Sequence, residues 1–249
     1  MKARMFSAMR RGPRNKQEDC LLSGLDIFQS DEIAKQSEIE AESLLFTVCD
    51  GLGGHQSGDL ASHFVCKQLK AKYQANAFQS QAVPLILRNI QNAAQHQLPD
   101  NCGTTLAGLY ATHQTVYIFN AGDSRVYKIE ESMARYISHD HSVVQELIDN
   151  YVILKQTAKN HPYRNLVEFG IGPLFVDSWQ HHSVFVHAEA YRPPVAFLMC
   201  SDGLSDLLTD DEIYQNLKST PVNNGRTLLS KVSEKGLIDN TSFIIVQFL

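Results

Sequence analysis

The sequence predicts an α+β protein in which layers of antiparallel β-sheet are covered by α-helices. Several short runs are rich in Val, Ile, Phe, Tyr and Thr and are bounded by Gly, Asp or Asn, as is typical of strands. The runs that begin at Thr104, Thr115 and Arg125 follow one another too closely for parallel crossovers. Helix-like segments are grouped before and after the strands, which argues against an alternating parallel fold.

Six segments have the composition of strands, namely residues 44–49, 104–111, 115–120, 125–129, 195–200 and 242–248. The four residues between the third and the fourth of these, Ala-Gly-Asp-Ser at 121–124, are turn formers. We therefore expect residues 115–129 to form a β-hairpin.

Five segments carry apolar residues at the spacing of an amphipathic helix. In the first, the expected buried face consists of Leu60, Ala61, Phe64, Val65, Leu69 and Tyr73. The others are residues 80–97, 142–150, 210–217 and 226–235. Thr209, followed three residues later by Glu212, predicts a capping box at the start of the fourth helix.

The composition excludes several classes of protein. Of 249 residues, 43% are hydrophobic and 20% charged, as in an ordinary folded protein of one or two domains. A net charge of -5 argues against non-specific nucleic-acid binding. The longest apolar run, Val195–Cys200, is far shorter than the ~20 residues that span a bilayer, and no apolar stretch follows the basic N-terminus as in a secretory signal. We expect no nucleic-acid or membrane partner.

The cysteines indicate a reducing compartment. Their number is odd, and none of them forms a Cys-x-x-Cys pair; they are Cys20, Cys49, Cys66, Cys102 and Cys200. Buried free thiols are therefore favoured over disulfides or a zinc site, and the cytoplasm is the expected location.

The residues most informative about chemistry are aspartates at the ends of apolar strands. Asp50 and Asp202 each follow such a run and precede glycine, and Asp239 stands just before another run. An Asp-Gly pair alone is a common turn. Three such carboxylates together favour an all-oxygen site for a hard cation, Mg²⁺ or Mn²⁺, because desolvating them is costly unless they are paired.

The segment around Asp50 partly matches three other motifs, but each of them lacks one required residue. A phosphate-binding P-loop would need lysine where Asp59 stands. A dinucleotide fingerprint would need glycine at Gln56. A phosphohydrolase with an aspartate nucleophile usually carries a second aspartate at the position of Leu52.

Eight segments, in order along nearly the whole chain, resemble the metal-dependent protein phosphatases (PPM, protein phosphatase 2C type). They are RNKQED from Arg14, VCDGLGGHQSGDLAS from Val48, CGTTLAGLY from Cys102, NAGDSRVY from Asn120, SHDHSVVQEL from Ser138, HPYRN from His161, CSDGLSDLLTDDEI from Cys200 and DNTSFIIV from Asp239. The DGLGGH form is similar to the bacterial branch of the family.

The resemblance implies a four-layer αββα sandwich in one catalytic domain, residues 1–249. It implies a stand-alone serine/threonine phosphatase in bacterial signal transduction, which hydrolyses phosphoserine and phosphothreonine by direct attack of a hydroxide bridging two Mn²⁺ or Mg²⁺ ions. The substrate would be a phosphorylated protein, the product of an opposing serine/threonine kinase.

The resemblance also assigns roles to residues. The two core ions would be held by Asp50, the Gly51 carbonyl, Asp202 and Asp239, with Glu18 acting through water and Asp19 beside it. Asp123 and Asp206 would hold a third, weaker ion, although the first also reads as a turn residue. Arg14 would bind the substrate phosphate, since a guanidinium pairs with two phosphate oxygens.

One position departs from the family pattern, and two questions stay open. Leu52 stands where eukaryotic-type members carry a histidine proposed as general acid, and His55 nearby is more simply a loop residue.

The basic residues near the N-terminus could extend a phosphopeptide groove, although scattered surface charges are commoner; they are Lys2, Arg4, Arg10, Arg11 and Lys16. The alternative functions are a catalytically weak or inactive partner-binding module of the same fold, and a phosphatase for small molecules.

Overall fold

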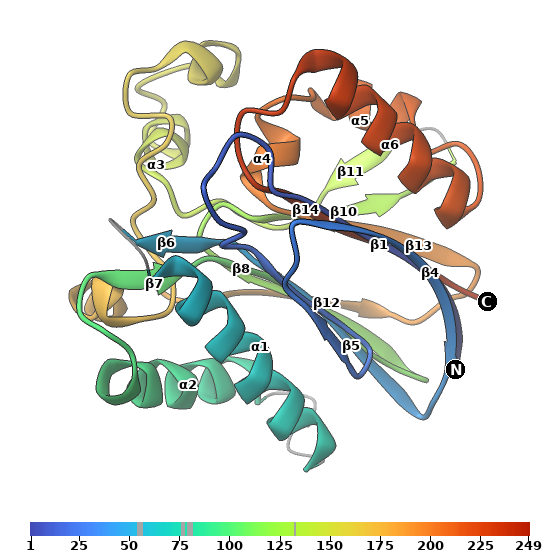
Figure 1. Cartoon of the computed structure of the whole chain (residues 1–249), viewed down its shortest axis with the longest axis horizontal. Helices are drawn as coiled ribbons and strands as arrows, with labels where there is room; N and C mark the ends of the chain where they lie inside the picture. The colour runs from blue at the N-terminus through green and yellow to red at the C-terminus, as the bar shows by residue number, and fades with distance from the viewer. Residues whose placement is uncertain (54–56, 76–77, 79–81, 132) are drawn as a thin grey trace.

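Two six-stranded β-sheets pack face to face, and helices cover both outer surfaces (Figure 1). The structure is a computed structural model and describes the whole chain except residues 54–56, 76–77, 79–81 and 132. Neighbouring strands in each sheet are antiparallel, for example β1 with β14 and β5 with β8. The predicted α+β architecture is confirmed.

The first sheet has the order β11 (Ala134–Tyr136), β10 (Arg125–Ile129), β13 (Val195–Cys200), β14 (Thr241–Phe248), β1 (Lys2–Arg10) and β4 (Glu32–Glu40). The second sheet has the order β12 (Phe185–Ala190), β9 (Thr115–Ala121), β8 (Leu106–Thr112), β5 (Ser43–Cys49), β2 (Cys20–Ser23) and β3 (Asp26–Phe28). A short ribbon of β6 (Gly51–Gly53) and β7 (Cys102–Thr104) extends from one end.

Helices lie on both outer faces of the sandwich. Over the second sheet lie α1 (Gly58–Gln74) and α2 (Val83–Gln97), and over the first lie α4 (Asp202–Ser205), α5 (Asp210–Gln215) and α6 (Pro221–Lys235). The chain between β11 and β12 holds α3 (Val143–Asp149) and the 3₁₀ turns η1 (Lys155–Asn160), η2 (Pro173–Phe175) and η3 (Asp177–Gln180).

Three layers of apolar side chains hold the two sheets and the helices on their outer faces together. Phe46 and Phe248 are fully buried between the two sheets. Val65 of α1 belongs to the layer under the second sheet, and Leu228 of α6 packs with Phe243 of β14 in the layer above the first. The burial of such side chains contributes roughly 1.5–3 kcal/mol each, and it fixes the helices to the sheets.

The strand predictions hold at 125–129 and 195–200, whose bounds match β10 and β13. The predicted run 104–111 divides at Thr105 into the end of β7 and β8.

The predicted hairpin at 115–129 is wrong, because β9 belongs to the second sheet and β10 to the first. Both strands already have neighbours on each side, so they have no free edge for one another. Gly122, at φ 102°, lets the chain cross between the sheets. Asn120 stabilises this crossing, since its amide nitrogen donates to the carbonyls of Gly122 and His139 at 3.1 and 2.7 Å.

The helix predictions hold in place but differ at their ends. The capping box of Thr209 and Glu212 is present. The last helix begins earlier than predicted, at Pro221, because Thr220 caps it and proline suits its first turn. Leu60 is wrong as a core residue, since it is 50% exposed. The predicted start of the second helix, at residue 80, lies outside the described residues.

The N-terminal strand β1 was not expected, because its basic residues obscure the strand pattern. Lys2 and Arg4 point outward and pair with Glu38 of β4 at 3.5 and 2.7 Å. These charges therefore belong to a solvated sheet surface. Within the described residues, no helix has the length and apolar character required to cross a bilayer.

Candidate metal centre

The predicted acidic residues meet at one end of the sandwich, where strands of both sheets stop. Asp50 directly follows β5 of the second sheet, and Glu18 stands shortly before β2, whose Cys20 lies opposite Cys49. Asp202 comes shortly after β13, and Asp239 shortly before β14 of the first sheet. Residues far apart in the sequence are brought together by this arrangement.

Asp50 and Asp202 form the centre of the group. Each of these carboxyl groups lies near enough to shift the pKa of the other. Burial raises the pKa of Asp50 well above its ordinary value, and the negative charges of Asp202 and Asp19 raise it further. Burial also raises the pKa of Asp202, to about 6.

Asp19 is fully buried and links the two sheets at the site. Its Oδ2 accepts a hydrogen bond from Ser201 Oγ at 3.0 Å, whereas Oδ1 has no partner in the structure. Burial raises the pKa of Asp19 to about 7, with a further contribution from Asp202. A buried carboxylate oxygen without a donor is costly, so this position favours a nearby cation or a water molecule.

Asp239 is engaged through both carboxylate oxygens. Oδ1 accepts the backbone N–H of Asn240 at 2.7 Å, and Oδ2 accepts a hydrogen bond from Arg14 Nη2. This hydrogen bond raises the pKa of Arg14. The predicted phosphate ligand Arg14 is thus at the site, where it is paired with a predicted metal ligand.

The loop that carries Arg14 and Glu18 is held by the side chain of Asn240. The amide nitrogen of Asn240 donates to the carbonyls of Arg11 and Lys16 at 2.7 and 3.0 Å, and its amide oxygen accepts the N–H of Glu18 at 2.8 Å. The role of Asn240 was not predicted, although the residue stands within the DNTS motif.

The glycines after Asp50 and Asp202 are required by close backbone packing. A Cβ on Gly51 would lie 2.3 Å from the Gly58 carbonyl oxygen, and one on Gly203 would lie 2.0 Å from that of Asn240. Neither glycine has a positive φ. The reason for glycine is therefore the close approach of a neighbouring segment and not a sharp turn.

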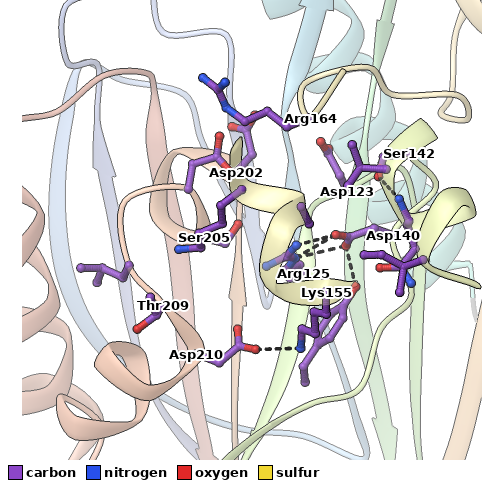
Figure 2. Close-up of a pocket in the computed structure, with 18 of the residues that line it drawn as sticks. Asp123, Arg125, Asp140, Ser142, Lys155, Arg164, Asp202, Ser205, Thr209 and Asp210 are labelled. Atoms are coloured by element: carbon purple, nitrogen blue, oxygen red, sulfur yellow. Dashed lines mark hydrogen bonds and ion pairs between the residues drawn. The ribbon is translucent and has the colours of Figure 1, made fainter. Parts of the chain in front are cut away.

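Asp123 and Asp206 lie beside this centre and line a pocket of about 970 Å³ together with Asp202 (Figure 2). Burial raises the pKa of Asp123 well above its ordinary value, and the charge of Asp202 adds to this effect. Asp206 is exposed at the pocket. The lining also includes Lys159 and Arg164, so both signs of charge face the same space.

A buried ion pair supports the same pocket. Arg125 of β10 donates to both carboxylate oxygens of Asp140, and the Tyr136 hydroxyl donates to Asp140 at 2.6 Å (Figure 2). Lys155 of η1 reaches Asp210 at 3.2 Å. These residues were not predicted individually, although the motifs GDSR and SHDHS contain two of them.

The remaining predictions concern the cysteines, Leu52 and His55. All five cysteines are buried and free, as predicted. Leu52 is partly buried in β6 and packs against the helix-side core. His55 lies outside the described residues.

The donor set fits a hard divalent cation. Within the described residues, no group of three or more His, Cys, Asp or Glu side chains is arranged so that it could hold one metal ion as it stands. Negative charges of neighbouring carboxylates nevertheless add to the raised pKa values of Asp19, Asp50 and Asp202, and the structure pairs none of these three with a basic side chain in its described part. Oxygen donors that carry surplus negative charge suit Mg²⁺ or Mn²⁺.

Known proteins share both the sequence pattern and the fold. The family model described as "Protein phosphatase 2C" matches residues 26–228. The serine/threonine phosphatase stp of Listeria innocua is 28% identical over 213 residues, which cover 80% of this chain and 82% of that protein.

Solved structures extend the likeness over the whole chain. The serine/threonine phosphatase Stp1 from Staphylococcus aureus superimposes with a TM-score of 0.81 and 26% identity, covering 99% of this chain and 94% of that one. The catalytic domain of the phosphatase PstP, solved in complex with two manganese ions, has the same fold, with a TM-score of 0.77, 21% identity and 99% coverage of both chains. With a family model that matches most of its length, this chain belongs to the protein phosphatase 2C family.

Proposed function

We propose that this protein is a metal-dependent protein serine/threonine phosphatase. The observation that carries the proposal is the group of acidic side chains from both sheets, in which Asp50 and Asp202 lie near enough to influence each other's pKa and buried Asp19 lacks a partner for one oxygen. Excess buried negative charge is unfavourable for the protein alone but suits the binding of divalent cations.

In this proposal Asp50, Asp202 and Asp239, with the Gly51 carbonyl, hold two Mn²⁺ or Mg²⁺ ions, and Glu18 supports them through water. Asp123 and Asp206 are proposed ligands of a third ion. When bound, the ions would supply a hydroxide near neutral pH for direct attack on phosphorus and would offset the charge of the phosphoryl group.

The chain's own side chains bind and orient the substrate. Arg14 holds the phosphate, because its planar fork can donate to two oxygens at once. Asn240 positions Arg14 and Glu18 by fixing their loop. The adjoining pocket has room for the segment of a phosphoprotein that flanks the phosphorylated residue.

We further propose that residues 1–249 act as one catalytic unit on substrates of an opposing serine/threonine kinase. The buried, unpaired thiols support a reducing compartment, the cytoplasm. The named relatives support the kinase-linked role, since they are serine/threonine phosphatases.

The test is hydrolysis of a phosphothreonine peptide by the full chain, with Mn²⁺ and with excess EDTA. We expect chelation to abolish turnover and Asp50→Asn to lower it roughly thousandfold, because the ions contribute several kcal/mol to the transition state. Asp100→Asn, at an exposed position, should leave the rate unchanged. Full activity in EDTA would contradict the proposal. Failure to bind Mn²⁺ at all would favour a partner-binding module of the same fold.

A further inference from the structure

We propose that a divalent cation and the Arg14 guanidinium compete for the carboxylate of Asp239, so that cation binding releases Arg14 to hold the phosphate. This inference rests on the proposed function. It adds an order of events: the cation binds to Asp239 first, and this binding frees Arg14, the proposed ligand of the phosphate.

The Asp239 carboxylate is already fully engaged by donors. One oxygen accepts the backbone N–H of Asn240 and the other accepts Arg14, so each has a donor in the structure. Asp239 retains 28% of its side-chain exposure, and Arg14 retains 52%. A full positive charge at Oδ2 opposes the approach of a second cation to the same group.

Arg14 can leave Asp239 without movement of its loop. Asn240 binds three backbone groups of the loop through its side chain, and none of these bonds involves Arg14. Gly12, at φ 63°, packs so closely that a Cβ there would lie 2.5 Å from the Asp239 carbonyl oxygen. The half-exposed guanidinium can therefore turn toward solvent or a phosphate while the backbone stays in place.

Competition for Asp239 couples cation binding to phosphate binding. If the cation displaces Arg14, and free Arg14 binds phosphate, then each ligand must strengthen the binding of the other by the same factor. Removal of Arg14 should tighten cation binding and weaken the coupling to phosphate. If Arg14 only bound phosphate, its removal would weaken the coupling to phosphate but would not tighten cation binding.

Lys16 provides a matched control on the same loop. Its ammonium group lies 3.6 Å from Asp59, is 50% exposed and makes no contact with Asp239 in the structure. The variant Lys16→Ala removes one positive charge near the centre without removing a competitor for Asp239. It therefore measures the general electrostatic effect.

The experiment is calorimetric titration of Mn²⁺ into the full chain for the wild type, Arg14→Ala and Lys16→Ala, first without and then with inorganic phosphate. We expect Arg14→Ala to lower the Kd for Mn²⁺ by roughly threefold to tenfold, the range for a partly exposed ion pair, and Lys16→Ala to lower it less than twofold. Phosphate should tighten Mn²⁺ binding more in the wild type than in Arg14→Ala. Thermal melts of the metal-free variants check that they are folded.

Equal effects of the two variants, or weaker Mn²⁺ binding by Arg14→Ala, would overturn the competition and leave the proposed function intact. Absence of Mn²⁺ binding in all three proteins would overturn the proposed function and this inference together.

Discussion

Arg125 holds Asp140 through three contacts: Nε lies 3.2 Å from Oδ1 and 3.0 Å from Oδ2, and Nη2 lies 2.6 Å from Oδ2. The side chain of Asp140 is only 5% exposed. Because the Tyr136 hydroxyl also donates to it, this carboxylate is satisfied by protein groups. The charge of Asp140 is therefore balanced by a side chain of the protein itself.

Breaking this pair should destabilise the protein strongly. Arg125→Met leaves the buried charge of Asp140 without its partner, and we expect a loss of about 3 kcal/mol in the free energy of unfolding. Urea denaturation with a chelator present measures it. The control is Arg11→Met, which breaks an exposed pair with Asp31 and should cost less than about 1 kcal/mol. Equal costs would contradict the assigned role of Asp140.

The metal-free protein should lose stability as the pH rises. The folded chain raises the pKa of Asp19 to about 7 and that of Asp202 to about 6, compared with about 3.9 in an unfolded chain. Between about pH 4 and pH 7 the native state therefore binds more protons than the unfolded state, and its free energy of unfolding falls. We expect a decrease on the order of a few kcal/mol, measured by urea denaturation in EDTA.

Added Mn²⁺ should reverse this trend, because cations bind the ionised carboxylates of the native state and compete with protons. A free energy of unfolding that rises with pH in EDTA would show that the carboxylates are not stabilised in their protonated form.

The Asn240 side chain should matter for both stability and turnover. Asn240→Ala removes three hydrogen bonds to the loop of Arg14 and Glu18, at an expected cost of about 2–3 kcal/mol. Phosphopeptide hydrolysis should fall as well, since both loop residues lose their fixed position. Asn216→Ala is the comparison, because its side chain donates to the carbonyl of Glu212; we expect a loss of about 1 kcal/mol and normal turnover. Unchanged turnover in Asn240→Ala would contradict the positioning role.

The five thiols should not react with Ellman's reagent in the native protein, because all of them are buried. In denaturant, all five should react, since none forms a disulfide. Rapid reaction of a native thiol would indicate local opening near its strand or helix.

The sequence identified those site residues that can be recognised from their immediate neighbours in the chain. Asp50 and Asp202 stand out because a carboxylate at the end of an apolar run is unusual, and both lie in the group of acidic side chains. The contacts of Asn240 were missed because they depend on partners far along the chain, for example residue 11 with 240. The pair of Arg125 and Asp140 was missed because its members, 15 residues apart, stand in separate motifs. Local patterns carry no information about such pairs.

The error at residues 115–129 has a similar cause. Turn residues at 121–124 are compatible with a hairpin and with a crossing between sheets, and the pairing of β9 with β12 and of β10 with β13 decides between them. These partner strands begin some seventy residues later in the chain. Strand composition alone could not decide which sheet each strand joins.

The bond from Ser201 to Asp19 joins the end of one sheet to the end of the other, while the two termini meet at the opposite end, where the Leu249 N–H donates to the Lys2 carbonyl (Figure 1). Enzymatic competence is thus a property of the docked pair of sheets. A substitution deep between them, far from any acidic side chain, can misalign the centre by sliding one sheet over its partner. Turnover is then a sensitive reporter of how well the sandwich is assembled.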